Sequence, residues 1–193
     1  TRLSVNNQNI DVVDNAKLLG TVLTNDLKWD SNTNKIVKSA NARMQILREI
    51  SSFGASLSDM KIIYFLFINS LLEQSSEVWH SSLTKENIQD LEHVQKSALR
   101  IILKNRYKSY KNALNILEID KLSDRREKLC LQFAKKCLKH PKLKQIFPLN
   151  NKNHSMETRN EETYAVKFAN TSRLQNSAIL YMQRLLNEDD KIN

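Results

Sequence analysis

Two hydrophobic patterns divide the chain near residue 29. Before this point, apolar and polar residues alternate around Asn-rich stretches, in residues 3–5 and 10–13 and again in residues 18–23. A period of two is typical of short β-strands. After this point, apolar residues recur every three or four positions, which is the period of an amphipathic helix. The pattern therefore predicts a mainly α chain, a helical bundle with a small amino-terminal β-hairpin.

The helical period recurs in six segments. They cover residues 31–51, 56–79, 84–104, 113–117, 124–140 and 177–187. Ser56, Thr84 and Ser123 are expected to cap three of these helices, because their side-chain oxygens can accept hydrogen bonds from free backbone N–H groups. The segment 56–79 is apolar on nearly all sides, which predicts the buried centre of a bundle. Pro141 is expected to end the helix before it, and residues 164–168 are predicted to form a short strand.

Composition limits both the fold and the setting. The 193 residues include only two glycines and two prolines, so the turn residues expected of a β-sandwich or barrel are missing. Cys130 and Cys137 lie seven positions apart on one predicted helix, or roughly 10 Å, which is beyond disulfide reach. The longest apolar run, residues 62–68, is far shorter than the roughly 20 residues of a membrane span. We expect reduced thiols, no membrane partner, and an intracellular location, nuclear or cytoplasmic.

The net charge of +9 is concentrated in the middle of the chain. Residues 1–83 carry 8 basic and 8 acidic side chains, residues 84–152 carry 17 and 7, and residues 153–193 carry 5 and 6. A concentrated basic segment is typical of a surface that binds polyanions, with nucleic acid first among them. An anionic membrane surface, an acidic protein partner and a merely solvated surface are the alternatives.

Aromatic residues in this basic region have two interpretations. Trp79 and Phe133 follow the apolar phase of their helices and are predicted to be core residues. Tyr107 and Tyr110 instead alternate with basic residues in the segment 106–111. They could stack on a nucleotide or pack at an ordinary hinge, and the sequence leaves both interpretations open.

Several stretches resemble the carboxy-terminal part of the reverse transcriptase of non-LTR retrotransposons, of the LINE and jockey-like group. The matching stretches are Lys-Leu-Leu-Gly at 17–20, Asp-Leu-Lys-Trp at 26–29, Ala-Asn-Ala-Arg at 40–43, Glu-Val-Trp-His at 77–80, and residues 94–102, 124–126 and 173–187. Their order and spacing agree over nearly the whole chain. The chain is thus identified, by resemblance, with the palm end and thumb of such a polymerase.

The resemblance implies an organisation into four parts. Residues 1–29 would be the end of the palm, 30–141 a helical thumb-like domain, 142–162 a polar linker, and 163–193 a tail with a short strand and a helix. Lys17, Leu18, Leu19 and Gly20 would form a primer-grip-like motif. The expected partners are an RNA·DNA or DNA duplex and the upstream fingers and palm of the same polyprotein.

Basic side chains on helical faces can follow phosphates without reading sequence, as a polymerase thumb requires. The residues selected on this ground for nucleic-acid binding are Lys96, Arg100, Lys104, Arg106, Lys108, Arg125, Arg126, Lys135 and Lys136.

No catalytic residues are predicted in this chain. Reverse transcription uses carboxylates that hold two Mg²⁺ ions, and the family supplies two of these carboxylates from an aromatic-x-Asp-Asp hairpin. Such a motif is absent from the sequence, and the single Asp pair, Asp189 with Asp190, lies in a polar terminus. The histidines and cysteines show no zinc-ligand spacing. We therefore expect no cofactor here, with Mg²⁺ confined to the intact polymerase, and duplex binding without polymerisation.

Two rival hypotheses remain. In the first, the chain is a structural or protein-interaction module, the 56–79 helix docks onto another chain, and the basic residues only confer solubility. In the second, the chain is an intact enzyme with an unrecognised active site. Primer extension would reveal the second, and duplex binding after removal of basic side chains would test the first.

Overall fold

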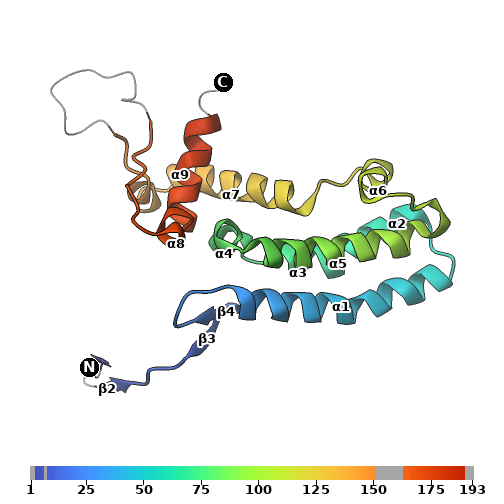
Figure 1. Ribbon diagram of the computed structural model, residues 1–193, viewed down its shortest axis with the longest axis horizontal. Coiled ribbons are helices and arrows are strands. Elements are labelled where there is room, and N and C mark those ends of the chain that lie inside the picture. The colour runs from blue at the N-terminus through green and yellow to red at the C-terminus, as the bar shows by residue number, and fades with distance from the viewer. Residues whose placement is uncertain (1–2, 7, 151–162, 190–193) are drawn as a thin grey trace.

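The computed structural model describes residues 3–6, 8–150 and 163–189, which form a long helical body with short strands at its amino-terminal end (Figure 1). The mainly α class predicted from the sequence is confirmed. Two antiparallel hairpins precede the helices, where the sequence predicted one. They pair β1 (Leu3–Val5) with β2 (Gln8–Ile10), and β3 (Asn15–Leu18) with β4 (Thr21–Thr24).

Two long helices, α1 (Asp30–Ser52) and α5 (Lys85–Leu103), pack along each other and form the frame of the bundle. The predicted starts at Ser56 and Thr84 are confirmed, because each side-chain oxygen accepts a hydrogen bond from the backbone N–H three residues on. The predicted Ser123 cap is wrong. Helix α7 (Leu122–Lys139) begins two residues before the predicted start at Asp124, and the Ser123 N–H donates to Glu92.

The segment predicted as one helix over 56–79 is interrupted. It consists of α2 (Leu57–Ile63), a π-helical turn η1 (Tyr64–Asn69), α3 (Ser70–Glu73), α4 (Ser76–Trp79) and a 3₁₀ turn η2 (His80–Ser82). The chain breaks at Ser75, whose φ of 53° is left-handed. The Trp79 indole Nε1 donates to the Gln74 carbonyl at 3.0 Å, which satisfies one polar group freed by this break.

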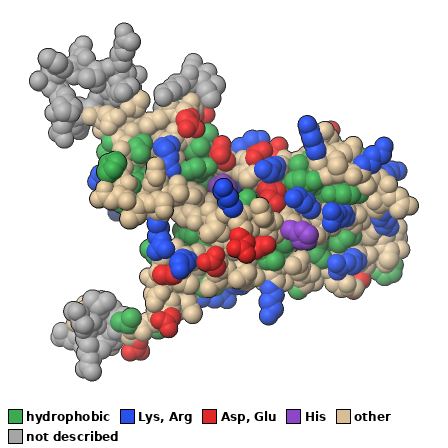
Figure 2. All heavy atoms as spheres, viewed as in Figure 1, with side chains coloured by type: hydrophobic (Ala, Val, Ile, Leu, Met, Phe, Trp, Pro, Cys, Tyr) green, Lys and Arg blue, Asp and Glu red, His purple; other side chains and the backbone are tan. Residues whose placement is uncertain are grey.

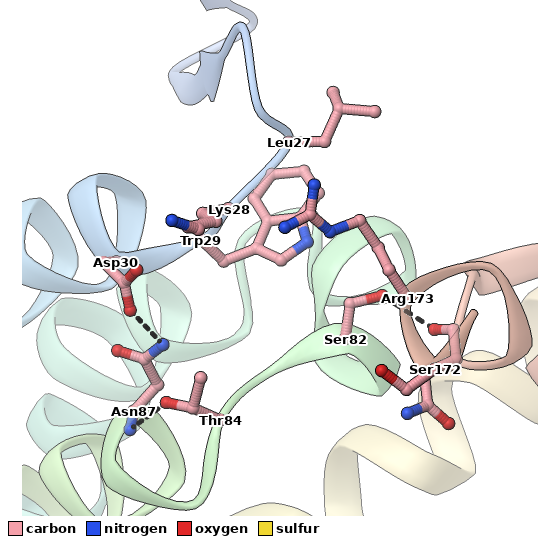
Figure 3. Close-up of a pocket in the computed structure, with 10 residues that line it drawn as sticks. Leu27, Lys28, Trp29, Asp30, Ser82, Thr84, Asn87, Ser172 and Arg173 are labelled. Carbon is pink, nitrogen blue, oxygen red and sulfur yellow. Dashed lines mark hydrogen bonds between the residues drawn. The ribbon is translucent and has the colours of Figure 1, made fainter.

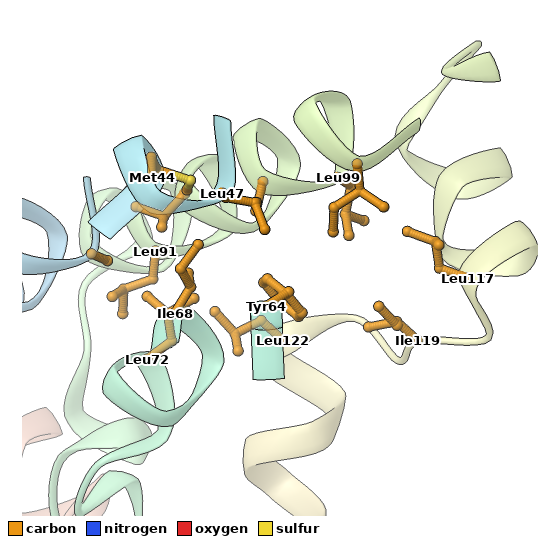
Figure 4. Close-up of a cluster of buried hydrophobic side chains, with 14 of the residues drawn as sticks. Met44, Leu47, Tyr64, Ile68, Leu72, Leu91, Leu99, Leu117, Ile119 and Leu122 are labelled. Atoms are coloured by element: carbon orange, nitrogen blue, oxygen red, sulfur yellow. The ribbon is translucent and has the colours of Figure 1, made fainter. Parts of the chain in front are cut away.

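The main hydrophobic cluster lies between α1, η1, α3 and α5 (Figure 4). Fully buried side chains at its centre include Leu47, Tyr64, Leu72, Leu91 and Leu99. Each such side chain contributes about 1.5–3 kcal/mol when it is removed from water. Trp79 is also fully buried, as predicted from its phase.

Two predicted core assignments are wrong. Phe133 is 44% exposed, and the 56–79 segment is not buried on all sides, because Ile62 and Leu66 are 55% and 63% exposed. The π-helical turn changes the helical phase after Ile63. Because the neighbouring helices cover only one side of the segment, its apolar residues cannot all face the core.

A second, smaller cluster is built on the far half of α7. There Cys130, Ala134 and Cys137 pack with Phe147 and with α9 (Ala178–Asp189). The bounds of α9 differ by one or two residues from those of the predicted terminal helix, 177–187. Both cysteines are free thiols, as expected from their spacing.

The region predicted as a linker, 142–162, is partly ordered onto this second cluster. It includes the 3₁₀ turn η4 (Leu143–Ile146), followed by the buried Phe147. Leu149 pairs with Tyr164 in an isolated bridge, and the remainder, 151–162, lies outside the described residues. The predicted strand 164–168 is otherwise wrong. Residues 165–169 have no regular structure and precede the short helix α8 (Ser172–Gln175).

Candidate nucleic-acid interface

The basic residues of α7 are mostly bound within the fold. The Arg125 guanidinium Nε pairs with the Glu73 carboxylate and lies over the Phe65 ring. Lys135 Nζ lies 2.6 Å from a carboxylate oxygen of Asp189. Both cations link α7 to another helix, α3 in the first case and α9 in the second. Their charges are therefore largely compensated before any ligand approaches.

Arg126 was wrongly predicted to bind nucleic acid. Its side chain is 0% exposed and therefore cannot contact a phosphate. The guanidinium lies 5.4 Å from the centre of the Trp79 ring, and Nε donates to the Leu122 carbonyl at 3.3 Å. Burial lowers the pKa of Arg126 to about 10, against the opposing effect of Glu92. The residue contributes to packing between α4 and α7.

His80 lies in the same buried junction. Burial, and then the charge of Arg126, lowers the pKa of His80 to about 4. The imidazole is therefore neutral at pH 7, and its ring contacts Tyr181 edge-on at 6.1 Å between centroids. This environment is that of a packed core histidine.

The basic residues of α5 are arranged differently. Lys96 Nζ lies 5.1 Å from the centre of the Tyr110 ring, and the Arg100 guanidinium carbon lies 5.2 Å from that of Tyr107. A cation over a ring face is attracted by the ring quadrupole, and this contact orients it without neutralising it. The spacing of four positions places Lys96 and Arg100 on one side of the helix. Neither forms an ion pair with any residue that the structure describes.

The two tyrosines are partly buried against the main hydrophobic cluster, where α5 connects to α6. The Tyr110 hydroxyl lies 2.6 Å from Gln95 Oε1 and also contacts the Glu92 carboxylate. Gln95 and Glu92 accept in turn from the backbone N–H groups of Leu122 and Ser123. Burial and then Glu92 raise the pKa of Tyr110, which keeps its hydroxyl proton in place. The tyrosines thus join α5, α6 (Tyr110–Leu117) and α7, and they support the cations above them.

The chain after α5 adds further cations. Lys104 begins the 3₁₀ turn η3 (Lys104–Arg106), and its Nζ donates to the Ser51 carbonyl at 2.8 Å. Arg106 and Lys108 are exposed and have no ion-pair partner within residues 3–6, 8–150 and 163–189. In Figure 2 the end of the molecule that carries α2, α5 and α6 shows mainly basic charged side chains, while acidic ones gather nearer the middle.

Lys136 remains exposed on α7 without an ion-pair partner in the described part of the chain. Further exposed lysines of the basic middle segment were not selected from the sequence. They include Lys111, Lys121, Lys139, Lys142 and Lys144. The dense basic run at 135–144 was the signal that could have indicated the last three.

The primer-grip-like residues form the turn of the β3–β4 hairpin. Leu19 and Gly20 both have positive φ, 47° and 86°, as a two-residue hairpin turn requires. Leu19 is 87% exposed, Leu18 is 60% exposed, and Lys17 is also exposed. Figure 1 places this hairpin at the opposite end of the body from α6, so the structure does not bring it together with the cations of α5.

Two side chains that sequence reasoning missed hold this turn. Gln74 Nε2 donates to the Leu19 carbonyl at 3.2 Å, and Lys35 Nζ donates to the Gly20 carbonyl. The φ of 86° favours glycine at position 20, and a Cβ there would lie 2.5 Å from Gln74 Nε2, the end of a flexible side chain that would have to move. No sequence motif indicates such a contact across 55 positions.

A cavity of about 320 Å³ lies beside Trp29, between the start of α1, the start of α5 and α8 (Figure 3). Lys28 pairs with the Asp26 carboxylate at 3.2 Å, and Arg173 donates to the Asp26 backbone carbonyl. Asn87 Nδ2 donates to Asp30 at 2.8 Å. These contacts join the tail to the start of α1.

No known protein family, curated protein or solved structure matches the chain. Within the described residues, no helix is both long and apolar enough to cross a membrane, and no three His, Cys, Asp or Glu side chains gather as metal ligands. Asp189 of the Asp pair contacts Lys135, and Asp190 lies outside the residues described.

Proposed function

We propose that this chain binds a nucleic-acid duplex through the cations of α5 and the α5–α6 connection, as the thumb-like part of a reverse transcriptase. The observation that carries the proposal is the arrangement of Lys96 and Arg100 over two tyrosine rings, next to the exposed Arg106 and Lys108. We call these four residues the α5–α6 cation set. They are held by packing and have no carboxylate partner among the described residues, so their charge is available to phosphates.

This arrangement supports binding that does not depend on sequence. The set offers two lysine ammonium groups and two arginine guanidinium groups, which suit phosphate oxygens. Tyr107 and Tyr110 face these cations from beneath and are half-buried, so they are not a stacking platform for bases. The partners of such a thumb would be an RNA·DNA or DNA duplex, and the fingers and palm of the same polypeptide.

The experiment is duplex binding by fluorescence anisotropy at several salt concentrations. We expect a slope of log affinity against log salt of about −0.9 for each phosphate contact. Replacing all four residues of the α5–α6 cation set by alanine should lower affinity by about 100-fold and reduce the slope magnitude by about 3 to 4. The matched control replaces Lys128, Lys135, Lys142 and Lys144, which removes the same charge, and should change affinity by less than about threefold. Equal losses in both variants would contradict the proposal.

A second candidate function is a protein-interaction module. It is favoured by the exposed apolar residues on α2 and η1, namely Ile62, Leu66 and Phe67, the last of which is 40% exposed. Exposed apolar patches often mark protein contacts. Replacing Leu66 by Glu should leave duplex binding intact under the first proposal. Unchanged duplex affinity in the four-alanine variant would favour the interaction module instead.

A further inference from the structure

A second cavity, of about 290 Å³, lies where the end of α1 and the start of α2 meet the end of α5. Five apolar side chains contribute to its lining, namely Ala55, Leu57, Met60, Ile102 and Leu103. The same lining includes Lys104, Asn105 and Arg106, all of them exposed. The cavity therefore combines apolar walls with a polar, basic rim.

The charge of this rim is uncompensated. Two cations and no carboxylate line the cavity, whereas the lining of the cavity beside Trp29 includes the carboxylate of Asp30, and its Lys28 pairs with Asp26. Lys104 Nζ reaches the Ser51 carbonyl, which keeps a positive charge at the rim. Arg106 has no hydrogen-bond or ion-pair partner among the residues described.

The rim also has a fixed backbone shape. Lys104 has a φ of 48° and a ψ of −123°, a conformation that non-glycine residues rarely adopt. Its N–H donates to the Arg100 carbonyl, and its own carbonyl accepts from the Tyr107 N–H at 3.1 Å. This turn directs the chain from the end of α5 around the cavity to the cations of the connection.

We propose that this cavity takes up a single unpaired nucleobase at the end of a bound duplex, and the inference rests on the proposed duplex binding. Apolar walls remove the flat faces of a base from water, and the Asn105 amide offers a donor and an acceptor to its edge. Arg106 contacts the adjoining phosphate, and Arg100 and Lys108 continue the contact along the strand. A base without a pairing partner enters at the least cost, because no pair has to be broken.

The test compares two RNA·DNA duplexes, one blunt and one with a single unpaired adenine at one 3′ end. The wild-type chain should bind the extended duplex about tenfold more tightly, a gain typical of one packed base. Ala55→Leu fills the cavity from its half-buried wall and should abolish this gain while keeping the affinity for the blunt duplex. The matched control, Ala42→Leu, changes an exposed residue of α1 and should keep the gain.

Circular dichroism would show whether Ala55→Leu folds. A second variant tests the cavity in case it does not. Asn105→Ala, at an exposed position, should reduce the gain by about threefold and leave blunt-duplex affinity unchanged. Equal wild-type affinity for the two duplexes overturns the inference, as does a gain that survives both variants.

A further arm separates this inference from the proposed function. If the wild-type chain does not bind a blunt duplex, but binds a five-adenine oligonucleotide and loses this binding in Ala55→Leu, the proposed duplex binding is contradicted and the base-binding cavity is supported. If a Leu-Glu-Glu peptide competes for the cavity and the oligonucleotide does not bind, the cavity is a peptide site and the inference is overturned.

Discussion

The basic residues of α5 and those of α7 are similar in the sequence but differ in the fold. Helix α7 binds several of its cations within the fold, since Arg125 pairs with Glu73, Lys135 pairs with Asp189, and Arg126 is buried. The cations of α5 lie over tyrosine rings and have no carboxylate partner among the described residues. The density of charge along a chain therefore does not measure the charge that a surface offers to a ligand.

The cause of this difference is position in the bundle. Helix α7 packs against α4, α5 and α9, so that much of its surface becomes an interface. A cation in such an interface must find a carboxylate or a ring, or else it loses hydration without compensation. The far end of α5 packs against α1, α2 and the short α6, but its cations Lys96 and Arg100 contact tyrosine rings rather than carboxylates. Removing a cation should therefore affect stability in α7 and binding in α5.

The largest effect is expected at Arg126. Its replacement by Ala leaves a cavity beside Trp79 and should lower the free energy of unfolding by about 3 kcal/mol, measured by urea denaturation. Replacement by Met fills most of the space without a buried charge and should cost less than about 1 kcal/mol. Neither variant should change duplex affinity beyond about twofold. A large loss of affinity in a stable Arg126→Met variant would remove the distinction between α5 and α7.

The next effect is a pH dependence that arises beside Arg126. Because the pKa of His80 falls from 6.5 in the unfolded chain to about 4 in the folded chain, the unfolded state binds the proton more readily between these values. Stability should therefore fall as pH decreases from about 6.5 to 4, by at most about 3 kcal/mol from this residue. His80→Phe, which keeps a ring against Tyr181, should flatten the profile, as thermal or urea unfolding at several pH values would show. An identical slope in wild type and variant would contradict the assignment.

A smaller effect on stability is expected at Arg125. Arg125→Ala removes the pair with Glu73 and the contact with Phe65, and should cost about 1 kcal/mol because the pair is only partly buried. The double variant Arg125→Ala with Glu73→Ala should cost little more than the single one, since the two residues are coupled. Duplex affinity should stay unchanged in both, which anisotropy can check.

The smallest changes concern single exposed cations. Arg100→Ala should lower duplex affinity by about fivefold and the magnitude of the salt slope by about 0.9, with little effect on unfolding. Lys128 pairs with Asp120 on the surface, and Lys128→Ala should change both affinity and stability by less than about 0.5 kcal/mol. Equal affinity losses in these two variants would show that binding follows net charge alone.

The starts of two helices could be predicted from the sequence, because hydrogen bonds between residues close in the chain determine them. Ser56 and Thr84 begin helices because each side chain accepts from an N–H only three residues away. The break at Ser75 could not be predicted, because the polar groups around it are satisfied by contacts such as the Trp79 indole on the Gln74 carbonyl. Ser123 failed as a cap because a glutamate 31 positions earlier accepts its N–H.

Periodicity, spacing and composition were enough to predict the mainly α class, the approximate limits of the long helices, the free state of both cysteines and the location of the basic segment. These properties depend on interactions over a few residues. The availability of each cation depends on the packing of the helices, because partners such as Glu73 and Asp189 lie more than 50 positions away from the cations they pair with. A buried arginine and an exposed one are identical in the sequence, and the packing of the helices determines how far each is exposed to solvent.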